Sequence, residues 1–170
     1  MKMKKSNCII LTISSLVILY LLISVGRFYI NQNHIPGFQD YGLDFSSNSG
    51  AEAIEIMGTP ILEEELSEQA RMYYTYRKPV FGKDAEIELV VNELTDYFFE
   101  VGVTWEFDTE QEAQEWFAKV KREVRKNSFL TVGSQERSYD STDWECNLGN
   151  LFCDVCVHGT RVVYSAVDGA

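Results

Sequence analysis

The chain is poor in the side chains that carry most enzyme chemistry. Its 170 residues include only two histidines, His34 and His158, and four cysteines. It has no glycine-rich phosphate-binding loop, and no serine–histidine–aspartate set or catalytic carboxylate pair can be specified from residue spacing. General-base catalysis by histidine therefore has one candidate, His158, because His34 lies in a stretch with the composition of a linker.

Basic residues are scarce beyond position 27. The chain has 15 Lys and Arg against 26 Asp and Glu, a formal net charge of −11. Four of the basic residues precede the first acidic one, so the chain after Arg27 holds 11 basic and 26 acidic residues, a formal charge of −15. Such a surface repels nucleic acid and anionic lipid headgroups. It suits a basic protein partner, or it serves solubility alone.

No charged residue occurs from Cys8 to Gly26, whereas Lys2, Lys4 and Lys5 stand before this stretch. A helix of that length covers roughly 28 Å, close to the thickness of a bilayer's hydrocarbon core. The lysines predict a cytoplasmic N-terminus, and we expect a single-pass signal anchor in a bacterial cytoplasmic membrane with the C-terminal domain outside. A signal peptide cleaved after Gly26, giving a secreted domain, is the alternative, because Ser24-Val25-Gly26 has a small-x-small pattern.

These features divide the chain into four expected parts. Residues 1–7 form a basic cytoplasmic tail and residues 8–30 a transmembrane helix in contact with the lipid bilayer. Residues 31–49 are rich in turn formers and read as a linker. Residues 50–170 form one extracytoplasmic domain, which is large enough for a hydrophobic core of its own.

Hydrophobic periodicity in the first part of this domain predicts one helix and three strands. The helix starts near Ser49 and ends at Met57, before Gly58 and Pro60. Residues 61–70 are acidic and fit either a helical turn or a loop. A period of two predicts strands over 71–80, 86–92 and 97–107. In the third strand, one set of alternate residues is expected to face the core: Tyr97, Phe99, Val101, Val103, Trp105 and Phe107.

A second helix and two hairpins are expected to complete the domain. Thr109 to Glu112 is a capping box, and the helix after it should pack Trp116 and Phe117 against Trp105. A short strand near 129–132, a polar loop through Asp140 and three further strands follow, with turns at Leu148-Gly149 and His158-Gly159. The expected fold class is α+β: an N-terminal transmembrane helix, then a two-layer sandwich of antiparallel sheet with two helices on one face.

The helix-stop motif Met57-Gly58-Thr59-Pro60, followed by an aromatic strand, resembles small extracytoplasmic α+β domains of the outer-membrane-assembly lipoprotein and β-lactamase-inhibitor-protein type. The likeness covers only this motif and the strand after it. The chain departs from the lipoprotein pattern because Cys8 lies at the start of the apolar run, not at its end. The resemblance implies a non-catalytic, protein-binding role.

The cysteines near the C-terminus allow several interpretations. Cys153 and Cys156 have C-x-x-C spacing, but in a strand they point to opposite faces, which does not suit thioredoxin-like chemistry. Cys146 and Cys153 share a face, and a disulfide between them is a candidate. A two-residue turn at Leu148-Gly149 would place Cys146 opposite Leu151, whereas a longer loop would align the two cysteines. The alternative is that they are small apolar core residues.

Asp154, Cys156 and His158 recur at every second position and so share one strand face. They are the candidate metal ligands, and Cys156 with His158 is the candidate catalytic pair. Neither set is complete, because successive residues on one face lie nearly 7 Å apart and no second Cys/His cluster occurs. We therefore expect no cofactor.

Taken together, these patterns favour a membrane-anchored, extracytoplasmic protein-interaction domain without enzymatic activity. An exported Cys/His-dependent enzyme is one alternative. An acidic immunity or inhibitor protein that binds a basic partner is the other, and the charge of the domain would speed such an association.

Overall fold

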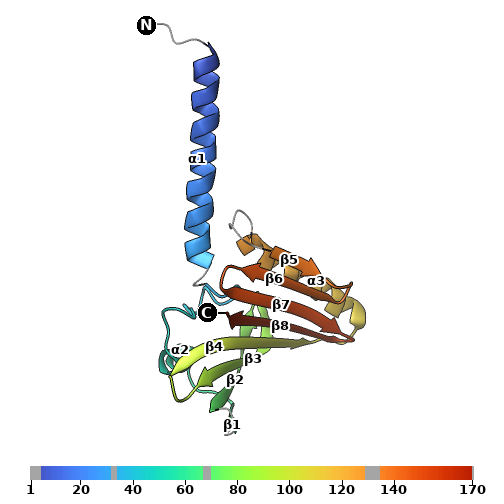
Figure 1. The fold of residues 1–170 in the computed structure, drawn as a ribbon. Coiled ribbons are helices and arrows are strands. Elements are labelled where there is room, and N and C mark those ends of the chain that lie inside the picture. Colours follow the sequence, from blue (N-terminus) through green and yellow to red (C-terminus); the bar gives the residue numbers. More distant parts are fainter. Residues whose placement is uncertain (1–4, 32–33, 67–69, 129–134, 170) are drawn as a thin grey trace.

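A single antiparallel sheet organises the molecule (Figure 1). The computed structural model describes residues 5–31, 34–66, 70–128 and 135–169. The order of the eight strands across the sheet is β1-β2-β3-β4-β8-β7-β6-β5. Their bounds are Leu62–Leu66 (β1), Arg71–Val80 (β2), Lys83–Asn92 (β3), Tyr97–Glu106 (β4), Gln135–Ser138 (β5), Asp143–Leu148 (β6), Leu151–His158 (β7) and Arg161–Asp168 (β8). The described helices are α1 (Lys5–Asn31), α2 (Gly50–Met57) and α3 (Glu110–Ser128).

The sheet consists of two four-stranded meanders that meet at β4 and β8. Each meander pairs strands that follow one another in the chain, β1 to β4 and β5 to β8. The junction is also antiparallel and places Gly102 opposite Ser165 and Trp105 opposite Val162. A helix precedes each meander, so the chain runs twice through the order helix and four strands.

Alternation along the strands buries one face of the sheet. β6, β7 and β8 each bury every second side chain, as expected for strands with one solvent-exposed and one buried face. The core also takes residues from β2, β3 and β4 and forms one continuous cluster. Its largest fully buried side chains are Trp105, Trp144, Tyr76, Tyr164, Phe38 and Phe98.

α3 covers the core face over β6, β7 and β8 (Figure 1). Thr109 caps this helix: its Oγ1 accepts a hydrogen bond of 3.2 Å from the Glu112 backbone N–H, which is one half of the predicted capping box. The apolar stripe of α3 is buried at Ala113, Phe117, Val120 and Val124. Trp116 is only partly buried, and its ring meets that of Trp105 edge to face, with 5.7 Å between centroids.

The segment from 34 to 49, expected to be a linker, packs on the sheet. Phe38, Leu43 and Phe45 are buried in the core. The Phe45 ring lies 4.7 Å from that of Phe98, between centroids, and the Tyr164 hydroxyl donates a hydrogen bond of 3.1 Å to the Pro36 carbonyl. The segment therefore supplies part of the second layer over β2–β4 and β8.

α2 confirms the predicted first helix. Ser49 caps it, with its side chain accepting from the Glu52 N–H, and the Glu52 carboxylate accepts from the Ser49 N–H. Gly58 ends it with a φ of 77°, a conformation that glycine adopts without strain. Gly50 has no room for a Cβ, because the Val91 side chain occupies that position.

Several strand predictions need correction. Part of the ambiguous stretch 61–70 is strand β1, and part of the expected polar loop before Asp140 is strand β5, because each pairs with the neighbouring strand's free edge. The strand expected near 129–132 lies outside the described residues. In β4, a bulge opposite Val90 and Val91 shifts the alternation, so Phe98 is buried while Tyr97 and Phe99 are not.

The predicted membrane span was wrong. Within the part of the chain that the structure describes, no helix is both long and apolar enough to cross a membrane. A membrane-spanning helix needs about 20 consecutive, predominantly apolar residues. This overturns the single-pass signal anchor over Cys8 to Gly26. The fold is one eight-stranded antiparallel sheet with three helices among the described residues.

Candidate functional site

The face of the sheet opposite α3 carries ordered rows of polar side chains. One row crosses six strands, because residues paired across strands point to the same side. It runs Glu88 (β3), Gly102 (β4), Ser165 (β8), Asp154 (β7), Glu145 (β6) and Arg137 (β5). The next row runs Tyr73, Val90, Glu100, Val167, Phe152, Asn147 and Gln135. We call this surface the open face.

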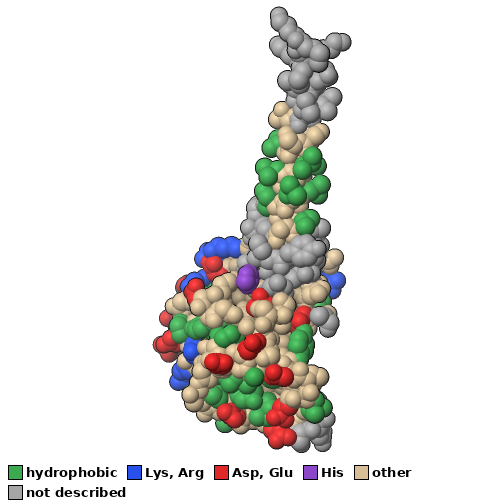
Figure 2. Space-filling model, turned by 90° about the vertical axis from the view of Figure 1, so that its left-hand side faces the viewer, with side chains coloured by type: hydrophobic (Ala, Val, Ile, Leu, Met, Phe, Trp, Pro, Cys, Tyr) green, Lys and Arg blue, Asp and Glu red, His purple; other side chains and the backbone are tan. Residues whose placement is uncertain are grey.

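Carboxylates crowd one another at two places on the open face. Desolvation raises the pKa of Glu88, and the nearby carboxylates of Glu100, Glu64 and Glu86 raise it further. Desolvation, together with the charges of Asp143 and Glu145, raises the pKa of Asp154 to about 6. Each site therefore holds negative charge that its surroundings do not neutralise. The surrounding surface is acidic as well: in Figure 2, acidic side chains are spread over the domain and basic ones gather mainly toward one margin.

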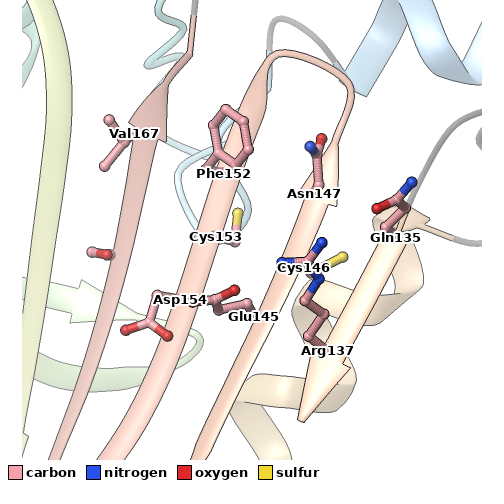
Figure 3. A pocket seen from close by; sticks show the side chains of 10 residues that line it. Gln135, Arg137, Glu145, Cys146, Asn147, Phe152, Cys153, Asp154 and Val167 are labelled. Atoms are coloured by element: carbon pink, nitrogen blue, oxygen red, sulfur yellow. The ribbon is translucent and has the colours of Figure 1, made fainter. Parts of the chain in front are cut away.

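A pocket of about 270 Å³ lies on the open face of the C-terminal half (Figure 3). Glu145 extends from β6 toward Asp154 on β7, and Arg137 reaches from β5 toward β6. Phe152 and Val167 form an apolar wall, and the Phe152 side chain is 49% exposed. The other lining residues are Gln135, Cys146, Asn147, Cys153 and Ser165.

The polar groups of this pocket are only partly paired among the described residues. Glu145 Oε2 accepts a hydrogen bond from the Tyr139 hydroxyl at 3.0 Å. Asn147 Oδ1 is buried and accepts no hydrogen bond from any described group. Arg137 makes no ion pair with a described residue, although Glu145 is its direct partner across the strands. The pocket thus presents a guanidinium and carboxylates that form no ion pair with one another.

The three residues predicted as metal ligands lie on the open face of β7. Asp154 faces Glu145 and Ser165, Cys156 faces Asp143 and Val163, and His158 faces Arg161. A search of the described residues finds no group of three His, Cys, Asp or Glu side chains placed to hold a metal ion. The reason is geometric, since alternate residues of one strand diverge along its length.

The predicted catalytic pair, Cys156 and His158, shows no nucleophile geometry. No hydrogen bond joins the two side chains in the described part of the chain. Desolvation raises the pKa of the Cys156 thiol, and the charges of Asp154 and Asp143 raise it further, so the thiolate is disfavoured. The charge of Arg161 lowers the pKa of this thiol, but the other effects outweigh it.

Cys146 and Cys153 lie directly opposite one another on β6 and β7. The turn is Gly149-Asn150, one residue later than predicted, so Leu148 pairs with Leu151 and the cysteine registers align. Both side chains are buried as thiols, and Cys153 Sγ lies 3.8 Å from the Tyr164 hydroxyl. Burial strongly raises the pKa of the Cys153 thiol. The disulfide between them stays a prediction, now with a register that permits it.

Most pocket residues escaped sequence reasoning. Alternation in the strand placed Asp154 on one face together with Cys156 and His158. It did not show that β5 would join β6, and therefore that Arg137 and Gln135 would stand beside Glu145 and Asn147. The sequence carries no such signal at Gln135 to Ser138, because four exposed polar residues have no apolar alternation that would identify a strand.

Comparison of the chain with protein-family models, with curated proteins and with solved structures finds no match.

Proposed function

We propose that this domain is a non-catalytic interaction module that binds a basic protein through its open face. The observation that carries the proposal is the contrast between the two faces of one sheet. α3, α2 and the 34–49 segment cover the core face, while the open face is left to solvent with its carboxylates crowded together. A basic partner would relieve this like-charge repulsion.

The mixed character of the open face supports a protein as its ligand. Partly exposed Tyr73, Phe99, Val163, Val167 and Phe152 lie between the carboxylates. Apolar and aromatic contact area beside charge is the usual composition of a binding surface, in which the charges steer the encounter and the apolar groups hold it. An inhibitor or immunity protein against a basic enzyme or toxin is the specific form that this composition suits.

Affinity capture with the full chain tests the proposal. We expect a basic partner whose association slows as the salt concentration rises, because screening weakens steering. The triple variant Glu88→Gln, Glu100→Gln, Asp154→Asn should bind that partner at least about tenfold more weakly. A matched control, Asp108→Asn, Glu110→Gln, Glu115→Gln, removes the same charges from exposed positions around the start of α3 and should bind normally.

Two outcomes would contradict the proposal. One is a specific partner that is acidic. The other is a basic partner that binds the open-face triple variant as tightly as the unaltered chain.

We also propose that the domain is exported, on the basis of the lysines that precede the apolar N-terminal stretch. A reporter fused after Ala170 should then be active only outside the cytoplasm. Activity inside would overturn this part of the proposal.

A further inference from the structure

The pocket on the C-terminal half of the open face has features that a basic protein partner does not explain. A surface made only to attract cations would not place a guanidinium without an ion pair to any described residue beside its carboxylates. Arg137 is nevertheless a lining residue, with Glu145 as its direct neighbour and Asp154 one strand further on. Positive and negative groups therefore line the same small cavity without pairing with each other.

We propose that this pocket binds a small zwitterion, an α-amino acid with an apolar side chain. Its ammonium group would lie between the carboxylates of Asp154 and Glu145, and its carboxylate would meet the Arg137 guanidinium. A guanidinium presents a planar fork of donors that matches a carboxylate. Carboxylates from two adjacent strands, which lie about 4.8 Å apart, can both reach one ammonium group.

An independent observation also points to a bound donor. The side-chain oxygen of Asn147 is buried in this region and accepts no hydrogen bond from any described residue. Buried polar atoms of this kind nearly always have a partner. Asn147 occupies the row next to Glu145 and Asp154 and lines the same pocket as their carboxylates.

The apolar wall and the size of the cavity restrict the ligand further. Phe152 and Val167 are direct neighbours across β7 and β8, in the row beside Asp154. The Phe152 ring is held in place by Gly169, where its atoms leave no room for a Cβ. A volume of about 270 Å³ lies just below the usual range for ligand pockets, about 300 to 1,000 Å³. The site therefore fits one small molecule whose aliphatic side chain rests on Phe152.

Titration calorimetry of the full chain with three related probes tests this site. The probes are L-leucine, 3-methylbutylamine, which lacks the carboxylate, and 4-methylpentanoate, which lacks the ammonium group. We expect leucine to bind with a Kd of about 1 mM or below, and each analogue at least about tenfold more weakly. The inference is independent of the protein partner proposed above, since none of these measurements involves one.

Variants of two of the arginines on the open face make the test sharper. Arg137→Gln should weaken leucine binding about tenfold and leave the weak binding of 3-methylbutylamine unchanged. Arg77→Gln, an exposed change on β2 outside the pocket, should alter neither. Circular dichroism should show all variants folded, because both arginine side chains are exposed.

Three results would overturn the inference. They are no heat of binding with leucine up to about 10 mM, equal leucine affinity in Arg137→Gln and the unaltered chain, or equal affinity for leucine and 3-methylbutylamine. The last would identify the pocket as a plain cation site.

Discussion

The two halves of the sheet share one order of elements but cover their core faces differently. α3 has 19 residues and covers its own half, β6 to β8. α2 has only 8 residues, so the irregular segment from 34 to 49 supplies the missing cover over the N-terminal half. The core of the N-terminal half is covered by Phe38, Leu43 and Phe45. In the other half, the same role falls to Phe117, Val120 and Val124. A segment without regular structure can therefore be as much a part of a core as a helix.

The same comparison on the open face shows what distinguishes the halves functionally. Glu88 on β3 and Asp154 on β7 occupy equivalent positions, one strand outward from the central pair Gly102 and Ser165. Desolvation, together with crowding by other carboxylates, raises the pKa of both. In the C-terminal half, Arg137 and an apolar wall lie beside the carboxylate, and this row forms a mixed-charge pocket.

The largest effect is expected where the halves meet. Trp105 is 1% exposed on β4, next to β8, and contacts Trp116 of α3. Trp105→Ala should reduce the free energy of unfolding by about 3–5 kcal/mol, through lost burial and the cavity left behind. Urea titration followed by circular dichroism and fluorescence should show one transition, because both halves share this core. Two separate transitions would mean that the halves are independent.

A nearly equal effect is expected in the segment that replaces a helix. Phe45→Ala should cost about 3 kcal/mol, because the ring is buried against Phe98. Asp40→Ala, an exposed change in the same segment, should cost less than about 0.5 kcal/mol. If denaturant titration gave equal stabilities for the two variants, the segment would be a spacer after all.

A smaller, pH-dependent effect is expected at Asp154. Its folded-state pKa of about 6 lies above the ordinary value of 3.8, so folding favours the protonated form. That stabilisation is complete below about pH 3.8 and is lost as the pH rises through about 6. Asp154→Asn cannot ionise. It should match the unaltered chain near pH 4 and exceed it by about 1 kcal/mol at pH 7.5, an amount reduced for the partial exposure of the group.

Thermal unfolding of both proteins from pH 4 to 8 would measure this difference. A gap in stability that stays constant with pH would show that the crowding of Asp154 with Asp143 and Glu145 carries no energetic weight.

The smallest effect is expected at the exposed end of the junction. Glu106 and Arg161 form an ion pair with 3.6 Å between Oε1 and Nε, and both side chains are more than half exposed. Solvent screening limits the contribution of such a pair. Glu106→Ala should therefore change the free energy of unfolding by less than about 0.5 kcal/mol. A loss above about 1 kcal/mol would indicate that this pair helps to join the halves.

Sequence reasoning was most successful where the signal is local and long. The capping box at Thr109, the helix stop at Gly58 and the period-two patterns of β2 to β4 and β6 to β8 all predicted real elements. It failed at β1 and β5, whose described residues are all exposed, because an exposed edge strand has no hydrophobic alternation to reveal it. It also placed one hairpin turn a residue early, which was enough to misalign Cys146 and Cys153.

What the sequence determined by itself is the set of local elements and the excess of negative charge, because caps, periodicity and composition act over a few neighbouring residues. Only the tertiary structure decided that β4 pairs with β8, that the 34–49 segment closes the core, and that Arg137 stands beside Glu145 and Asp154. Those relations join residues far apart in the chain, and they follow from which apolar faces bury one another best rather than from any local pattern.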